Sequence, residues 1–223
     1  MITAIPSCSE LFGHCRTIAS ALFHDTRFPW KPLDDISSFI ASIGPALPKS
    51  EYRHLPHNIY IARSAHIAPN AHIAPYTIID TGAEIRHCAF IRGSAIVGKR
   101  SVVGNSCELK NCILFDDVQV PHFSYVGDSI LGWKAHLGAG AVTSNLKSDK
   151  SPIVIKVGED IFRTERKKLG AILGDCVEIG CNAVLCPGTI IGRNTTVYPL
   201  SRVRGVIPAD SIFKSADNIV HKH

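Results

Sequence analysis

An aliphatic side chain recurs at every sixth position along one stretch of the chain, from Ile61 to Leu109. The residue four positions further on is small in eight of the nine repeats. A helix does not produce this pattern, because six is not a multiple of 3.6 residues. One large and one small inward residue per six predict short strands joined by tight corners, stacked as coils ~4.8 Å apart. The sequence therefore predicts an all-β fold, a parallel β-helix. The aliphatic positions are Ile61, Ile67, Ile73, Ile79, Ile85, Ile91, Val97, Val103 and Leu109.

The repeat also predicts how the chain is organised. Its frame slips by one residue near Leu114, fails between residues 145 and 170, and resumes at Leu173. Long insertions at coil corners are often functional, and this one is rich in Lys and Arg. We expect it to form a hairpin through 152–157 and 160–163. The expected organisation is an N-terminal helical cap and linker (1–57), a β-helix domain (58–208, with the insertion at 146–170) and a C-terminal tail (209–223).

The residues before the repeat carry helix signals. Ser7 followed by Glu10 fits a capping box that opens a helix to about His24. A second helix is expected over Leu33–Ile43, ending at Gly44. Terminal caps of repeat proteins cover the exposed edge of the first repeat. We therefore expect these two helices to cover the first coil.

The composition narrows the class of protein. The net charge is +5, and no dense stripe of Lys and Arg with interleaved aromatic residues points to nucleic acid. The longest apolar stretches are shorter than the ~18–20 residues of a membrane span, and Met1–Pro6 carries no secretory signal. The eight cysteines form no Cys-x-x-Cys pair, which is typical of reduced thiols. We expect a cytoplasmic protein that binds no nucleic acid and spans no membrane.

Three segments resemble one family of enzymes: Val103–Asn111, Pro121–Asp128 and Leu137–Asn145. Such hexapeptide repeats are similar to the left-handed β-helix acyltransferases. More narrowly, residues 92–145 resemble the C-terminal acetyltransferase domain of the bifunctional bacterial N-acetylglucosamine-1-phosphate uridyltransferase/glucosamine-1-phosphate acetyltransferase. The element His-x-x-Tyr-[aliphatic]-Gly-Asp is fairly specific for that domain. No Gly-rich nucleotide loop precedes Ile61, so the chain resembles a stand-alone, pyrophosphorylase-like form.

The resemblance implies residues for the acceptor sugar. His122 matches the catalytic base. Arg92 and Lys110 match residues that hold the sugar phosphate. Tyr125 lies near the sugar, and Asn145 matches a residue beside the amino group.

The resemblance also implies a site for the co-substrate, acetyl-CoA. Ala139 matches a backbone contact near the thioester. Cys181 stands where the family has a Ser that contacts the pantetheine. We expect no metal ion in the site.

Three positions depart from the family pattern. His136, in the sugar site, replaces an Asn, and Leu146 replaces a Tyr after Asn145. The insertion removes any match to a downstream Lys. These departures affect the expected acceptor more than the expected type of reaction, so the identity of the acceptor stays open.

The chemistry of two groups of residues agrees with this assignment. Acetylation of an amine needs a base near neutrality, and His has an unperturbed pKa of about 6.5. The alternative for His122 is a surface residue at a coil corner. Arg92 and Lys110 are separated by three hexads, or one full coil, so they are expected to stack on one edge as a phosphate clamp or as two solvated cations.

Hexapeptide-repeat carbonic anhydrases, which bind zinc through three His, are a rival family. His66 and His72 lie one hexad apart, but the His-x4-His spacing of that family is missing. The spacing of the other candidates brings no three imidazoles to one point. We therefore expect no zinc site.

The leading hypothesis is an acetyl-CoA-dependent N-acetyltransferase for an amino-sugar phosphate. Glucosamine 1-phosphate, in the synthesis of UDP-N-acetylglucosamine, is the expected acceptor. The resemblance implies a homotrimer with sites between subunits. One alternative is acyl transfer to a nucleotide-linked sugar from an acyl carrier protein. Another is a non-catalytic trimeric scaffold that partners a nucleotidyltransferase.

The insertion concentrates positive charge, because seven cations lie between its residues 147 and 168. Such a loop could attract the phosphates of CoA or could simply be solvated. The seven are Lys147, Lys150, Lys156, Arg163, Arg166, Lys167 and Lys168.

Overall fold

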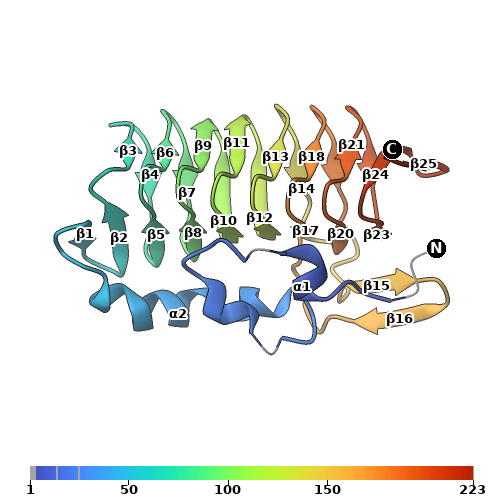
Figure 1. Cartoon of the computed structure of the whole chain (residues 1–223), viewed down its shortest axis with the longest axis horizontal. Coiled ribbons are helices and arrows are strands. Elements are labelled where there is room, and N and C mark those ends of the chain that lie inside the picture. The colour runs from blue at the N-terminus through green and yellow to red at the C-terminus, as the bar shows by residue number, and fades with distance from the viewer. Residues whose placement is uncertain (1–3, 14, 25, 223) are drawn as a thin grey trace.

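The chain winds into a three-sided parallel β-helix, which confirms the left-handed β-helix predicted from the hexapeptide repeats (Figure 1). The structure, a computed structural model, describes residues 4–13, 15–24 and 26–222. A coil takes three hexads where Ile61 pairs with Ile79, and one residue fewer where Val97 pairs with Leu114. The one-residue slip of the repeat is therefore a shorter coil, and the stack continues through it.

Three ladders of strands form the sides. The first side holds β2 (Ile59–Ala62), β5 (Thr77–Ile79), β8 (Ala95–Val97), β17 (Ala171–Leu173), β20 (Thr189–Ile191) and β23 (Val206–Ile207). The second side holds β3 (His66–Ile67), β6 (Glu84–Ile85), β9 (Val102–Asn105), β11 (Gln119–His122), β13 (His136–Leu137), β18 (Glu178–Ile179), β21 (Thr196–Val197) and β24 (Ser211–Ser215). The third side holds β4 (His72–Ile73), β7 (Phe90–Ile91), β14 (Val142–Thr143), β19 (Val184–Leu185) and β22 (Arg202–Val203). Two longer strands, β10 (Glu108–Leu114) and β12 (Tyr125–Leu131), turn a corner and belong to the third and first sides.

The predicted aliphatic positions fill the interior. Ile79, Val97 and Leu109 are fully buried. Ile67 and Ile73 are half-buried, because their coil lies at the end of the stack. The small positions point inward as well, and Ala95 has no exposed surface.

The first side is apolar on its outer face too. Ile78 lies between the inward residues Thr77 and Ile79, so its side chain points outward. The register places six isoleucines in one outer row, and each is fully buried: Ile78, Ile96, Ile113, Ile130, Ile172 and Ile190.

The N-terminal helical region covers this row. The helix α2 (Ile36–Ile43) contacts β5, β8 and β10, and the 3-10 helix η2 (Lys31–Asp34) contacts β10 and β12. Figure 1 shows the region running along the side of the stack. The chain thus covers one apolar face of the β-helix with its own residues.

The first predicted helix is wrong. The capping box of Ser7 and Glu10 is present, but α1 covers only Cys8–Leu11. A 3-10 helix, η1, follows at Ser20–Phe23, and residue 14 lies outside the described residues. The helical prediction to His24 fails because the segment bonds to the β-helix instead.

Two backbone hydrogen bonds show the reason. The Asp175 N–H donates to the Leu11 carbonyl at 2.9 Å, and the Asp116 N–H donates to the Arg16 carbonyl at 2.9 Å. These carbonyls would otherwise accept from the next turn of a helix. Docking on the coils satisfies them and ends the helix.

The second predicted helix is confirmed in its C-terminal part. The α-helix begins at Ile36 and has Gly44 as its C-cap residue. The residues before it form η2, and a short 3-10 helix, η3 (Gly44–Ala46), follows.

Antiparallel strands, and not helices, cover both edges of the stack. At the first coil, β1 (Tyr52–Leu55) pairs antiparallel with β2. At the last, β25 (Asn218–His221) pairs antiparallel with β24, within the segment expected to be a tail. The prediction that the N-terminal helices cover the first coil is therefore wrong.

The insertion forms the predicted hairpin. Its strands are β15 (Val154–Val157) and β16 (Asp160–Arg163), paired antiparallel. Ile153 and Ile155 are buried, so the hairpin is packed on the body of the protein.

Candidate active site

His122 lies at the corner between the second and third sides, where β11 ends. Its side chain is exposed, and the residues on either side in the hexad, Val120 and Ser124, point inward and are buried. Phe123 turns the corner with a φ of 51°. In the preceding coil, a Cβ on Gly104 would lie 1.6 Å from the Pro121 carbonyl oxygen, so only glycine allows this close stacking.

Three predicted site residues stack at this corner on successive coils. The Gly140 N–H donates to the His122 carbonyl at 3.0 Å, and the Asn182 N–H donates to the Ala139 carbonyl at 2.9 Å. The pairing of Leu137 with Ile179 places Cys181 level with Ala139. Neighbouring coils lie ~4.8 Å apart. The structure thus brings the predicted base and the two predicted acetyl-CoA contacts into one row, the His122 row (His122, Ala139 and Cys181).

Two residues outside the prediction extend the row toward the first coil. Asn105 pairs with His122, and its Nδ2 donates to the His87 carbonyl at 3.4 Å. Asn105 follows His87 by three hexads, and His122 follows Asn105 by one residue fewer, so each step is one coil. The sequence spacing alone could therefore have placed Asn105 and His87 in the His122 row.

Three of the residues predicted for the sugar gather at the next corner, around a carboxylate that the prediction did not include. We call Lys110, Tyr125, Asp128 and Asn145 the Asp128 corner. Lys110 Nζ donates to both oxygens of Asp128 at 3.0 Å, and Asn145 Nδ2 donates to Asp128 Oδ2 at 2.6 Å. Asn145 Nδ2 also donates to the Tyr125 hydroxyl at 3.1 Å. Asp128 is the last residue of the element His-x-x-Tyr-[aliphatic]-Gly-Asp, so the sequence did carry a signal for it.

The tyrosine at this corner keeps its proton at neutral pH. Burial raises the pKa of the Tyr125 hydroxyl, and the nearby carboxylates of Asp128 and Glu108 raise it further. The hydroxyl therefore remains available as a hydrogen-bond donor.

Arg92 and Lys110 lie on adjacent coils, as their spacing predicts. Ile91 pairs with Leu109, so the next residue of each strand falls on the same edge. Each cation already has a carboxylate partner, because Arg92 Nη1 lies 2.7 Å from Glu108 Oε1 and Lys110 contacts Asp128. A phosphate bound here would share these cations with the carboxylates.

His136 lies on the second side, outside the His122 row. Its Nδ1 is 2.7 Å from Glu178 Oε2 in the next coil. The role of His136 in the sugar site stays a prediction.

One cation of the insertion, Arg166, reaches the Asp128 corner. The Arg166 guanidinium forms an ion pair with Asp34 of η2, and its Nη2 lies 3.9 Å from Asp128 Oδ1. Lys147 Nζ lies 3.7 Å from Asp149 Oδ2. Within one chain, one side of the β-helix separates this loop from the His122 row, so its attraction for CoA phosphates stays a prediction.

A hollow of about 440 Å³ lies between the insertion and the coils. Leu146, Ile153 and Pro187 give it an apolar lining, and Lys147 and Arg204 add positive charge. Ser144 and Leu146, the two neighbours of Asn145 in the sequence, both line it.

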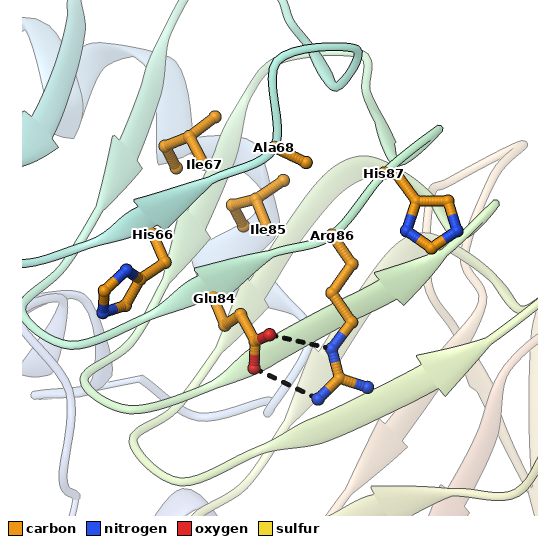
Figure 2. A pocket seen from close by; sticks show the side chains of 7 residues that line it. All are labelled: His66, Ile67, Ala68, Glu84, Ile85, Arg86 and His87. Atoms are coloured by element: carbon orange, nitrogen blue, oxygen red, sulfur yellow. Dashed lines mark hydrogen bonds and ion pairs between the residues drawn. The ribbon is translucent and has the colours of Figure 1, made fainter.

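A second hollow, of about 410 Å³, lies on the second side of the first coils, away from every predicted site residue (Figure 2). Arg86 donates to both oxygens of Glu84 at 3.1 Å, and His66 and His87 lie on either side of this pair. The Glu84 carboxylate and the Arg86 guanidinium are thus paired with each other.

His66 lies on the second side and His72 on the third, so adjacent hexads do not bring these imidazoles together. Over the described ranges, no three His, Cys, Asp or Glu side chains are grouped so that they could hold a metal ion. The described helices include none long and apolar enough to cross a membrane.

Sequence comparison finds relatives among bifunctional sugar-phosphate enzymes. The chain is 37% identical over 122 residues to the bifunctional protein GlmU of Methanococcus maripaludis, covering 55% of this chain and 29% of the relative. It is 32% identical over 116 residues to a bifunctional sugar-1-phosphate nucleotidylyltransferase/acetyltransferase of Sulfurisphaera tokodaii, covering 52% and 29%. The chain thus spans less than a third of the length of these relatives. The resemblance seen in the sequence is confirmed.

Among solved structures, the acetyltransferase domain of PglB from Neisseria gonorrhoeae in complex with acetyl coenzyme A matches with a TM-score of 0.27 and 15% identity. The match covers 73% of this chain and 56% of that one. The family model of the GMPPB C-terminal domain matches residues 77–191, which is just over half of the chain. This match includes the His122 row and the Asp128 corner, and the chain belongs to the family of the GMPPB C-terminal domain.

Proposed function

We propose that the chain is an acetyl-CoA-dependent N-acetyltransferase that acts on an amino-sugar phosphate, with glucosamine 1-phosphate as the expected acceptor. The observation that carries this proposal is the His122 row. An exposed imidazole stands one coil from the Ala139 backbone and two coils from Cys181. A relative named as a bifunctional sugar-1-phosphate nucleotidylyltransferase/acetyltransferase adds support, because it matches this chain over 116 residues.

The proposed reaction assigns a role to His122, to the Ala139 backbone and to the two cations Lys110 and Arg92. The acceptor nitrogen attacks the thioester carbonyl, and the carbon–sulfur bond breaks as CoA leaves. His122 takes the proton from the nitrogen and passes it to the leaving thiolate. The Ala139 N–H stabilises the oxyanion, and Lys110 and Arg92 neutralise the sugar phosphate.

Binding of acetyl-CoA tests the proposal. Calorimetry on the purified chain should give saturable binding of acetyl-CoA, and acetylation of glucosamine 1-phosphate should follow. Absence of binding would favour a non-catalytic scaffold. Transfer only from acyl carrier proteins would favour the alternative enzyme, an acyltransferase that acts on a nucleotide-linked sugar.

We also propose that the chain forms a homotrimer with sites between subunits. The outer face of the third side carries exposed apolar side chains, because Phe90 and Val184 are 41% and 39% exposed there. Light scattering should give three times the 24.2 kDa mass of one chain. A monomer in solution would contradict the trimer and the shared sites.

A further inference from the structure

Asp128 is a buried carboxylate to which the proposed reaction assigns no role. It is 2% exposed, and the Asn111 Nδ2 donates to its Oδ1 at 3.0 Å in addition to the bonds from Lys110 and Asn145. Arg166 adds a second cation at 3.9 Å. A carboxylate only accepts hydrogen bonds. Every neutral group that contacts it must therefore turn a donor toward it.

This requirement fixes the orientation of the Asn145 amide. Its Nδ2 lies 2.6 Å from Asp128 Oδ2 and 3.1 Å from the Tyr125 hydroxyl, so both N–H groups are used. Flipping the amide, so that its oxygen and nitrogen exchange places, would put Asn145 Oδ1 against the carboxylate, with two acceptors in contact. In the described part of the chain, Oδ1 has no hydrogen-bond partner, and it is left for a ligand.

The same chain of bonds sets the role of Tyr125. Its hydroxyl oxygen accepts from Asn145, which leaves its own hydrogen free to donate. The raised pKa of the hydroxyl keeps that hydrogen in place. The corner thus presents one acceptor, Asn145 Oδ1, and one donor, the Tyr125 O–H.

We infer that Asp128 is a positioning residue that makes Asn145 an acceptor for the amine of the substrate. This inference rests on the proposed function. An amine that donates one N–H to Asn145 Oδ1 keeps its lone pair for the thioester and its second N–H for the base. The site therefore selects a sugar phosphate that carries a donor beside a group able to accept from Tyr125.

The test compares two ligands in the full-length chain. Calorimetry gives the ratio of Kd values for 2-deoxyglucose 1-phosphate, which lacks the amine, and glucosamine 1-phosphate. We expect Asp128→Asn to lower this ratio about tenfold, the usual effect of one hydrogen bond. A weakened contact between Lys110 and the phosphate affects both ligands equally and cancels in the ratio. The Kd for acetyl-CoA should not change.

Asp117→Asn is the matched control. Asp117 is also a corner residue with positive φ, and its carboxylate accepts from Arg100 at 2.7 and 2.8 Å, away from the site. Asn145→Ala should lower the ratio as Asp128→Asn does, and it tests the inference even if Asp128→Asn does not fold. In the Asn145→Ala background, Asp128→Asn should have no further effect on the ratio.

The outcomes separate this inference from the proposed function. A wild-type chain that acetylates glucosamine 1-phosphate, with the same ratio in Asp128→Asn or in Asn145→Ala, would overturn the inference alone. A wild-type chain that binds neither sugar phosphate and transfers no acetyl group would overturn both.

Discussion

Replacing His122 with alanine is expected to lower acetylation by roughly 10²–10⁴-fold, the usual contribution of a general base. The side chain is exposed at the corner and fills no part of the interior, whereas Val120 and Ser124 of the same hexad are buried. The coil should therefore stay intact, and acetyl-CoA binding should be nearly unchanged. The measurement is kcat, alongside the melting temperature and the oligomeric state.

His87→Ala provides the control for this experiment. His87 is exposed at the same corner, two coils earlier, where its carbonyl accepts from Asn105. It should keep the turnover of the wild type. Near wild-type turnover in an intact His122→Ala protein would mean that His122 is only a corner residue and that the proposed mechanism is wrong.

Replacing Phe115 with alanine is expected to lower the free energy of unfolding by about 3–5 kcal/mol, the range for buried Phe→Ala changes. Phe115 is fully buried, and its ring lies 4.8 Å from that of Phe12 and 5.1 Å from that of Phe23. The substitution removes one of the contacts that hold the N-terminal segment on the coils. Denaturant unfolding monitored by circular dichroism measures the loss.

Phe123→Ala is the matched control, because it removes the same side chain from an exposed corner of the same β-helix. Phe123 is 64% exposed, so the change should stay within about 0.5 kcal/mol. Equal stability of the two variants would show that the N-terminal segment contributes little to the stability of the fold.

The repeat predicted the β-helix because each inward position is set locally. A large residue such as Ile79 and a small one such as Ala95 are required in every coil, so the signal recurs along the sequence. The hairpin of the insertion was predicted for a similar reason, since adjacent strands pair through a short turn.

The first helix was mispredicted because its carbonyls have partners far away in the sequence. The capping box at Ser7 formed as the local signal indicated. The bond from Asp175 to Leu11 joins residues that are far apart in the sequence, and no local pattern indicates it. The repeat likewise does not indicate which segment covers the outer row of isoleucines, and in the structure α2 and η2 cover it.

The sequence by itself determined the coils, and with them the stacking of Arg92 beside Lys110. Through the resemblance, it also pointed to His122 as the candidate base. Only the tertiary structure placed Asp128 against Lys110, Asn145 and Arg166, which lie on different coils and on the insertion. The physical reason is that the near-constant length of a coil fixes which residues stack. The partner of a buried charge depends instead on side chains that converge from several coils.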